Sequence, residues 1–223
     1  MKIDRTKNAG RNIVFGCMLK IYQIVMPFIM RTLMIYYMGI QYLGLNSLFT
    51  SILQVLNLAE LGVGSAMVYS MYKPIAVDDK KMICALMKLY RTYYRVIGII
   101  IAFLGLCLVP FIPKLIKSDV PADINIYVLY ILNLSVTVLS YWLFAYKNCL
   151  LDAHQRTDVA SKVTLVTNTL QYIVQFFTLC ILKNYYAYII VSLAAQALTN
   201  ILTAVVATHM YPDYRPEGNL SKE

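Results

Sequence analysis

Apolar residues form long runs that recur along the whole chain, separated by short polar stretches. Several runs reach the length of about 20 residues that an α-helix needs to cross the hydrocarbon core of a bilayer. We expect six transmembrane helices, at about 12–38, 42–72, 93–116, 124–147, 163–183 and 187–208. The short connections between some of them predict antiparallel neighbours. The pattern therefore predicts an all-α integral membrane protein.

The composition excludes a soluble globular domain. Hydrophobic residues make up 60% of the chain and charged residues 14%, and the mean hydropathy is +0.62. The formal net charge is +9, but the basic residues flank apolar segments, which favours membrane lipid over nucleic acid as their partner. The cysteines are isolated, and no phosphate loop, nucleophile motif or metal-ligand spacing occurs. We therefore expect no metal, no cofactor and no enzyme activity.

Lysine and arginine are distributed unevenly among the connections. Fifteen lie before the first span, in the second and fourth connections and after the last span, against three in the others. By the positive-inside rule, both termini are predicted to be cytoplasmic. Residues 1–11 then form a basic cytoplasmic N-terminus and residues 12–208 a six-helix lobe. Residues 209–223 are expected to be a cytoplasmic coil, a shortened linker to a second lobe.

Two basic residues, Lys20 and Arg31, lie inside the first predicted span. They are eleven residues apart, so on a helix they share one side, about 16 Å from each other. Each intramembrane charge costs about 2.5–3.5 kcal/mol even on the gentler insertion scales. Two on one side predict a hydrated path for an anion, and Arg31 has no acidic residue at its depth. Snorkelling of both side chains to the interface is the alternative.

The second predicted span carries a polar stripe that includes Gln54, Asn57 and Glu60. A polar stripe on a membrane helix faces protein or water rather than lipid, so Gln54 and Asn57 are expected to line the path or to form interhelical hydrogen bonds. Antiparallel packing places Glu60 nearly level with Lys20. An ion pair, a proton or cation coupling site and a neutral, hydrogen-bonding acid are the open interpretations of Glu60.

Two polar connections carry clusters of charge. Residues 80–95 are amphipathic and predict a basic helix on the cytoplasmic membrane surface, which anchors the chain or contacts a lipid-linked phosphate. The basic residues that share its polar face are Lys81, Lys88, Arg91 and Arg95. Residues 152–158 hold two aspartates, a histidine and an arginine, and we interpret them as solvated loop charges.

One stretch resembles a known family. Arg31, the segment 39–45 (Gly-Ile-Gln-Tyr-Leu-Gly-Leu) and the segment 60–66 (Glu-Leu-Gly-Val-Gly-Ser-Ala) are similar in order and spacing to the opening of the Wzx-type polysaccharide flippases. These flippases belong to the multidrug/oligosaccharidyl-lipid/polysaccharide exporter superfamily. The resemblance implies one lobe of a MATE-like transporter that moves undecaprenyl-diphosphate-linked oligosaccharide across the bacterial plasma membrane for surface polysaccharide export.

The resemblance also implies roles for particular residues. Arg31 would be a cation of the substrate cavity, and Glu60 the acidic residue of the second span. Lys20 is assigned as a second substrate contact from its position on the helix alone. Family members have about twice as many spans, in two pseudo-symmetric lobes. We therefore expect a second six-helix lobe, from the same gene, from a split gene or from a second copy of the chain.

Other functions stay open at this point. A cation-coupled multidrug exporter of the same superfamily would use Glu60 as its coupling site, although the spans hold more basic than acidic residues. An inactive or accessory half-transporter would need no substrate path. A membrane enzyme acting on polyprenyl-linked sugars would need carboxylates or histidines in a substantial loop, and the loops here are short.

Overall fold

The computed structural model describes residues 5–57, 62–116 and 120–218, and within these ranges the chain is helical with no strand. The helices are α1 (Arg5–Tyr37), α2 (Ile40–Asn57), α3 (Val63–Ala76), α4 (Lys80–Leu108), α5 (Ile112–Leu115), α6 (Ile126–Trp142), α7 (Tyr146–Ala153), α8 (Thr157–Phe177) and α9 (Tyr185–Met210). A 3₁₀ turn at Val109–Phe111 joins α4 to α5, and a π-helical segment at Thr178–Leu182 follows α8. The predicted all-α class is confirmed.

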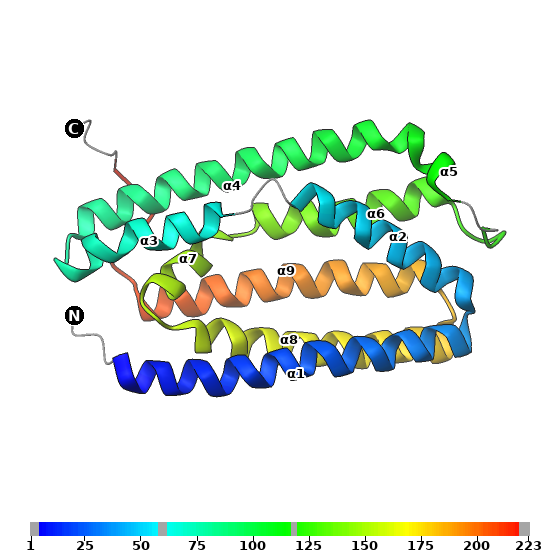
Figure 1. Cartoon of the computed structure of the whole chain (residues 1–223), viewed down its shortest axis with the longest axis horizontal. Coiled ribbons are helices and arrows are strands. Elements are labelled where there is room, and N and C mark those ends of the chain that lie inside the picture. Colours follow the sequence, from blue (N-terminus) through cyan, green and yellow to red (C-terminus); the bar gives the residue numbers. More distant parts are fainter. Residues whose placement is uncertain (1–4, 58–61, 117–119, 219–223) are drawn as a thin grey trace.

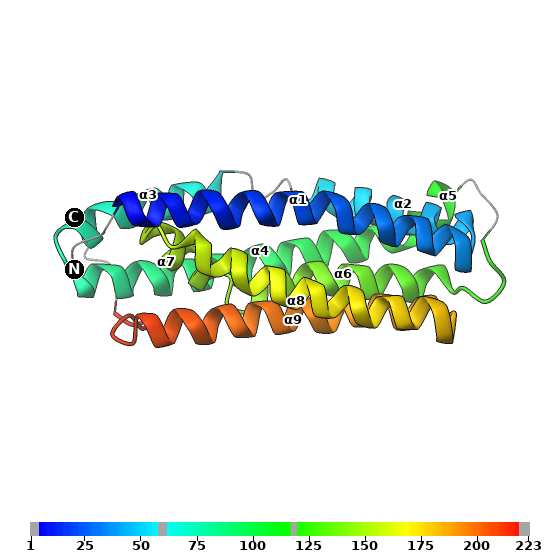
Figure 2. The same ribbon diagram turned by 90° about the horizontal axis from the view of Figure 1, so that it is seen from below.

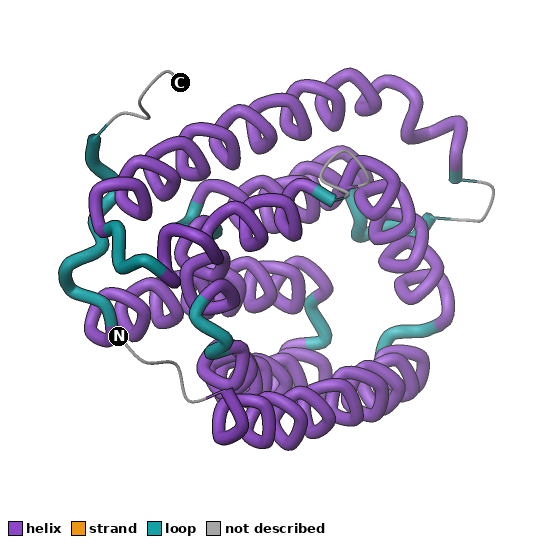
Figure 3. Tube along the Cα trace, turned by 60° about the vertical axis from the view of Figure 1, so that its left-hand side comes forward, coloured by secondary structure: helices purple, strands orange, loops and turns teal. Residues whose placement is uncertain are grey.

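The long helices lie side by side in an elongated bundle (Figures 1 and 2). Helix α1 packs along α8, α8 along α9, and α9 along α6, which in turn packs on α4. Short loops connect most of these helices (Figure 3). The beginning of α1 and the end of α9 lie at the same end of the bundle (Figure 1).

Four helical segments are long and apolar enough to cross a membrane: Asn8–Tyr37, Lys80–Leu115, Thr157–Leu182 and Tyr185–Met210. A fifth span results if α6 and α7, bent by 49° at their junction, are counted together. The chain is therefore compatible with a multi-pass membrane protein. The predicted span 42–72 is divided between α2 and α3, and neither helix by itself is long and apolar enough to cross a membrane. Six spans and cytoplasmic termini stay predictions.

Helix α4 begins at Lys80, whereas the third predicted span begins near residue 93. Its start is fixed by Asp79, whose carboxylate accepts a hydrogen bond from the Met82 N–H at 3.0 Å. The basic segment is thus continuous with the third span. A helix of 29 residues is about 43 Å long, more than the roughly 30 Å of bilayer hydrocarbon. Residues 80–95 are therefore the first half of one long helix and not a separate helix.

The core is packed where α2, α4 and α6 meet. Phe49 and Tyr130 are fully buried and stack edge to face, with ring centroids 5.6 Å apart. The Tyr130 hydroxyl donates a hydrogen bond to the Gly105 carbonyl at 3.0 Å. A side chain at Gly105 would overlap Leu134, so glycine allows α4 and α6 to approach closely.

Residues 152–158 are not a solvated loop, and that expectation is wrong. The Asp158 side chain is fully buried, and its carboxylate accepts hydrogen bonds from Arg156 at 2.9 Å and Lys162 at 3.2 Å. The Arg11 guanidinium lies 3.8 Å from the same carboxylate. Asn12 accepts a hydrogen bond from the Asp158 N–H and donates one to the Gln155 carbonyl. These contacts fix the start of α1 against the start of α8.

The segment after α9 is also more ordered than the expected coil. Tyr211 and Tyr214 are buried, and their rings stack on His154, with centroids 4.3 and 5.6 Å away. Asp213 forms an exposed ion pair with Lys80 at 2.6 Å, and this pairing lowers the pKa of Asp213. The first residues of the predicted tail are therefore docked against α4 and the α7–α8 connection.

Replacing Asp158 with asparagine is expected to destabilise the protein by about 3 kcal/mol. This loss of stability is at the low end of the range for breaking a buried ion pair, because the three basic partners of Asp158 are partly exposed. Thermal unfolding in detergent, followed by the fluorescence of the single tryptophan, Trp142, measures the change. The exposed Glu217→Gln serves as the control. Equal midpoints for both variants would show that the cluster does not hold α1.

Acidification is expected to weaken the docking of residues 211–214. Burial lowers the pKa of His154 below its usual value of about 6.5, so the folded state favours the neutral ring. As the pH falls below about 6.5, the unfolded chain takes up the proton first, and the stability contributed by neutral His154 is lost. The unfolding midpoint of the wild type should fall more steeply between pH 7.5 and 5.5 than that of His154→Phe. Equal slopes for the wild type and His154→Phe would contradict the prediction.

Candidate functional site

Arg31 lines a cavity of about 270 Å³ between α1, α2, α6, α8 and α9. Its wall is mixed, and the polar part includes Asn46, Thr50, Asn133, Gln171, Gln175 and Ser192. Met30 and Met34 of α1 are buried, whereas Arg31 between them is exposed, so Arg31 lies on the open side of the cavity. The structure therefore places Arg31 at the rim of this cavity.

The charge of Arg31 is not neutralised by the residues that the structure describes. None of them forms an ion pair or a hydrogen bond with its guanidinium, and the described lining contains no carboxylate. A guanidinium presents several N–H donors in a planar fork that fits phosphate oxygens. The cavity is thus suited to an anionic group.

A buried amide adds an acceptor to the same cavity. Gln175 is 1% exposed, and its side-chain nitrogen donates to the Ser192 hydroxyl at 2.7 Å and the Tyr188 carbonyl at 3.2 Å. Its oxygen, Oε1, is buried and has no donor among the described residues. An unsatisfied buried acceptor is costly. A hydroxyl group of a ligand or a water molecule would supply the missing donor.

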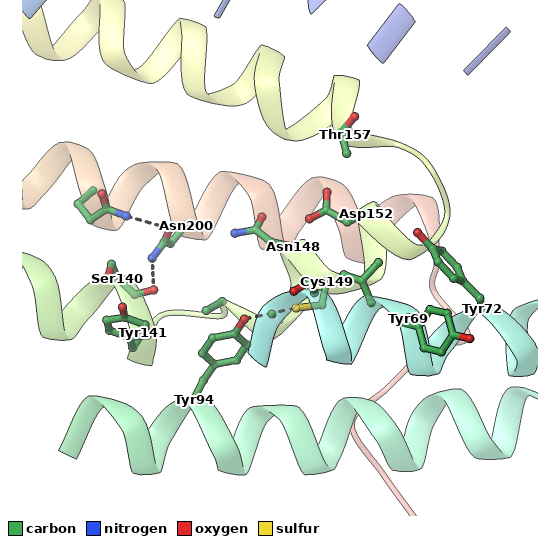
Figure 4. Close-up of a pocket in the computed structure, with 15 residues that line it drawn as sticks. Tyr69, Tyr72, Tyr94, Ser140, Tyr141, Asn148, Cys149, Asp152, Thr157 and Asn200 are labelled. Carbon is green, nitrogen blue, oxygen red and sulfur yellow. Dashed lines mark hydrogen bonds between the residues drawn. The ribbon is translucent and has the colours of Figure 1, made fainter. Parts of the chain in front are cut away.

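A second, larger cavity of about 810 Å³ lies between α3, α4, α6, α7, α8 and α9. It contains one carboxylate, Asp152, which has no ion pair and no side-chain hydrogen bond with the described part of the chain. Asp152 and Asn148 lie between Tyr72 of α3 and Asn200 of α9 (Figure 4). This cavity is suited to a cation or to a neutral polar ligand.

Polar residues of α9 line both cavities. Ser192 lines the Arg31 cavity, and Gln196 and Asn200 line the Asp152 cavity. Gln196 donates to Asn200, and Asn200 donates to the Ser140 carbonyl, both at 3.2 Å (Figure 4). The spacing of four residues places all three on one side of the helix. Sequence analysis did not single out this stripe, although the same periodicity was recognised in the second span.

The other predicted site residues lie elsewhere. Lys20 and Gln54 are exposed and line neither cavity. Asn57 accepts a hydrogen bond from the Tyr141 hydroxyl at 3.2 Å and links α2 to α6. Glu60 lies outside the described residues, so its predicted pairing with Lys20 stays a prediction. On α4, Lys81, Lys88 and Arg95 are exposed and Arg91 is half-buried.

Among the residues that the structure describes, no three histidine, cysteine or acidic side chains lie close enough together to hold a metal ion. Comparison with known proteins adds no assignment. No protein-family model, no curated protein and no solved structure matches the chain. The residues and their geometry therefore carry the functional argument.

Proposed function

We propose that this chain forms one half of a membrane transporter that flips undecaprenyl-diphosphate-linked oligosaccharide across the bacterial plasma membrane. The observation that carries the proposal is Arg31, a cation at a polar cleft between apolar helices with no anionic partner among the described residues. The resemblance of residues 31–66 to Wzx-type flippases supplies the substrate class. Transport of this kind requires no covalent chemistry.

The two ends of such a substrate need different surroundings. Its diphosphate would pair with the Arg31 guanidinium, which offsets part of the cost of holding that charge between helices. Its sugar hydroxyls would meet the amides and hydroxyls of α8 and α9, among them Gln175 and Ser192. Its polyprenyl chain would stay in the lipid. The exposed Lys20 of α1 would contact the headgroup of the substrate at a different depth in the membrane from Arg31.

Alternating access requires two bodies that move relative to each other. In this proposal the second body is another six-helix lobe, encoded by the same gene, by a split gene or by a second copy of this chain. It would cover the open side of the Arg31 cavity. The outward surface of α1 is apolar there, since Ile24 and Phe28 are 72% and 71% exposed.

Replacing Arg31 with glutamine is expected to reduce transport at least tenfold, because charged hydrogen bonds contribute about 1.5–3 kcal/mol. The variant is expressed in bacteria that lack this chain, and surface polysaccharide and lipid-linked oligosaccharide on the inner leaflet are measured. Arg31→Lys should retain part of the activity. Lys114→Gln, which removes an exposed charge outside the cavity, should behave like the wild type. Full activity of Arg31→Gln at normal expression contradicts the proposal.

A second candidate function is export of organic cations, favoured by the Asp152 carboxylate in the larger cavity. Tyrosine rings on the same wall, including those of Tyr69 and Tyr72, could contact a cation through their faces. If this function is correct, Asp152→Asn should lower the efflux of cationic dyes at least tenfold, with Asp123→Asn as the control. Efflux that is the same with and without the chain would rule this candidate out.

A further inference from the structure

A third concave surface lies at the end of the bundle where α9 ends. It is a groove of about 850 Å³ formed by the α6–α7 junction, the last turns of α9 and the segment that follows α9. Its apolar part includes Phe144, Ile201 and Val205, which are 42%, 43% and 58% exposed. Ile201 and Val205 belong to a helix long and apolar enough to cross a membrane, and their side of the groove would meet lipid if the helix does so.

Three basic side chains line the same groove: Lys147, His209 and Arg215. No acidic residue is part of the described lining. The nearby Asp213 is paired with Lys80. The groove therefore combines an apolar floor with uncompensated positive charge.

Lys147 is the most informative of the three. The residue is only 5% exposed, and its ammonium group has no hydrogen bond or ion pair with any residue in the described ranges. Its ammonium nitrogen lies over the ring of the neighbouring Tyr146, 5.9 Å from the ring centroid. An ammonium group on a side chain that is mostly enclosed by protein is stabilised when an anion pairs with it. An anionic ligand in the groove would supply that compensation.

The groove has a fixed shape because the chain after α9 is held in place. Tyr211 and Tyr214 stack on His154, and the Lys80–Asp213 ion pair fastens the same segment to α4. These contacts keep Arg215 beside the last turn of α9. A free tail would leave Lys147 and His209 without this third basic group.

We propose that this groove binds one anionic phospholipid from the adjacent leaflet. The lipid phosphate pairs with Lys147 and Arg215, with His209 at the same rim, and an acyl chain lies along Ile201, Val205 and Phe144. Basic pockets between membrane helices bind anionic headgroups in this way. The apolar floor distinguishes such a lipid from free phosphate, which would leave Ile201 and Val205 uncovered. This proposal does not depend on the Arg31 cavity or on the transported substrate.

The test compares thermal stabilisation by lipids in detergent. Purified full-length chain is titrated with phosphatidylglycerol, with phosphatidylcholine or with inorganic phosphate. Phosphatidylglycerol should raise the unfolding midpoint at concentrations at least tenfold lower than phosphatidylcholine, and inorganic phosphate should have little effect. Equal action of the two lipids, or full stabilisation by inorganic phosphate alone, overturns the proposal.

Variants locate the lipid in the groove. Lys147→Gln and Arg215→Gln should each weaken the phosphatidylglycerol effect at least tenfold, whereas Lys73→Gln and Lys183→Gln, exposed lysines outside the groove, should not. Without lipid, Lys147→Gln should unfold no earlier than the wild type, because it removes a charge that has no partner among the described residues. If Lys147→Gln does not fold, Arg215→Gln and the groove-filling Val205→Phe decide the question. Unchanged lipid stabilisation in both shows that the groove is not the site.

Discussion

Every polar group on a membrane-spanning helix needs a partner within the protein, because hydrocarbon offers none, and this constraint organises the bundle. Hydroxyl groups such as those of Thr50 and Thr208 donate to the carbonyl one turn earlier on their own helix. Longer or better-placed groups bridge helices, as Gln175 does to Ser192. The polar stripe of α9 therefore faces its neighbours, and apolar residues remain for the outer surface.

The charged groups are of two kinds: those that have partners within the fold and those that do not. Asp158 is buried, and three basic side chains surround it, so its role in joining α1 to α8 is sufficient to explain it. Arg31, Asp152 and Lys147 have no such partner among the described residues, and each lines a cavity or groove. A charge that the fold does not compensate costs stability. Its retention beside an open space favours a ligand of opposite charge.

The sequence was sufficient for the helical class and for several membrane-spanning segments, because long apolar runs are a local property. Helical periodicity places Lys20 and Arg31 on one side of α1, but it could not show that Arg31 alone of the two lines a cavity, because that depends on the helices packed against α1. The sequence failed for Asp158, because the partners Arg11 and Asn12 are about 146 residues away in the chain. The continuity of α4 was missed because the amphipathic residues 80–95 were interpreted as a separate surface helix, whereas an Asp79 cap begins one continuous helix.

Snorkelling and ligand binding make different demands on Arg31, and the structure bears on the choice. A snorkelling arginine extends along a lipid-facing surface towards headgroups and needs no polar neighbours. Arg31 instead shares a cavity with buried Gln175, whose oxygen lacks a donor among the described residues, and with Ser192. Amide and hydroxyl groups at this depth are costly without ligands or water to satisfy them. Their convergence on the same cleft as the cation favours a hydrated, ligand-accessible site over an interfacial anchor.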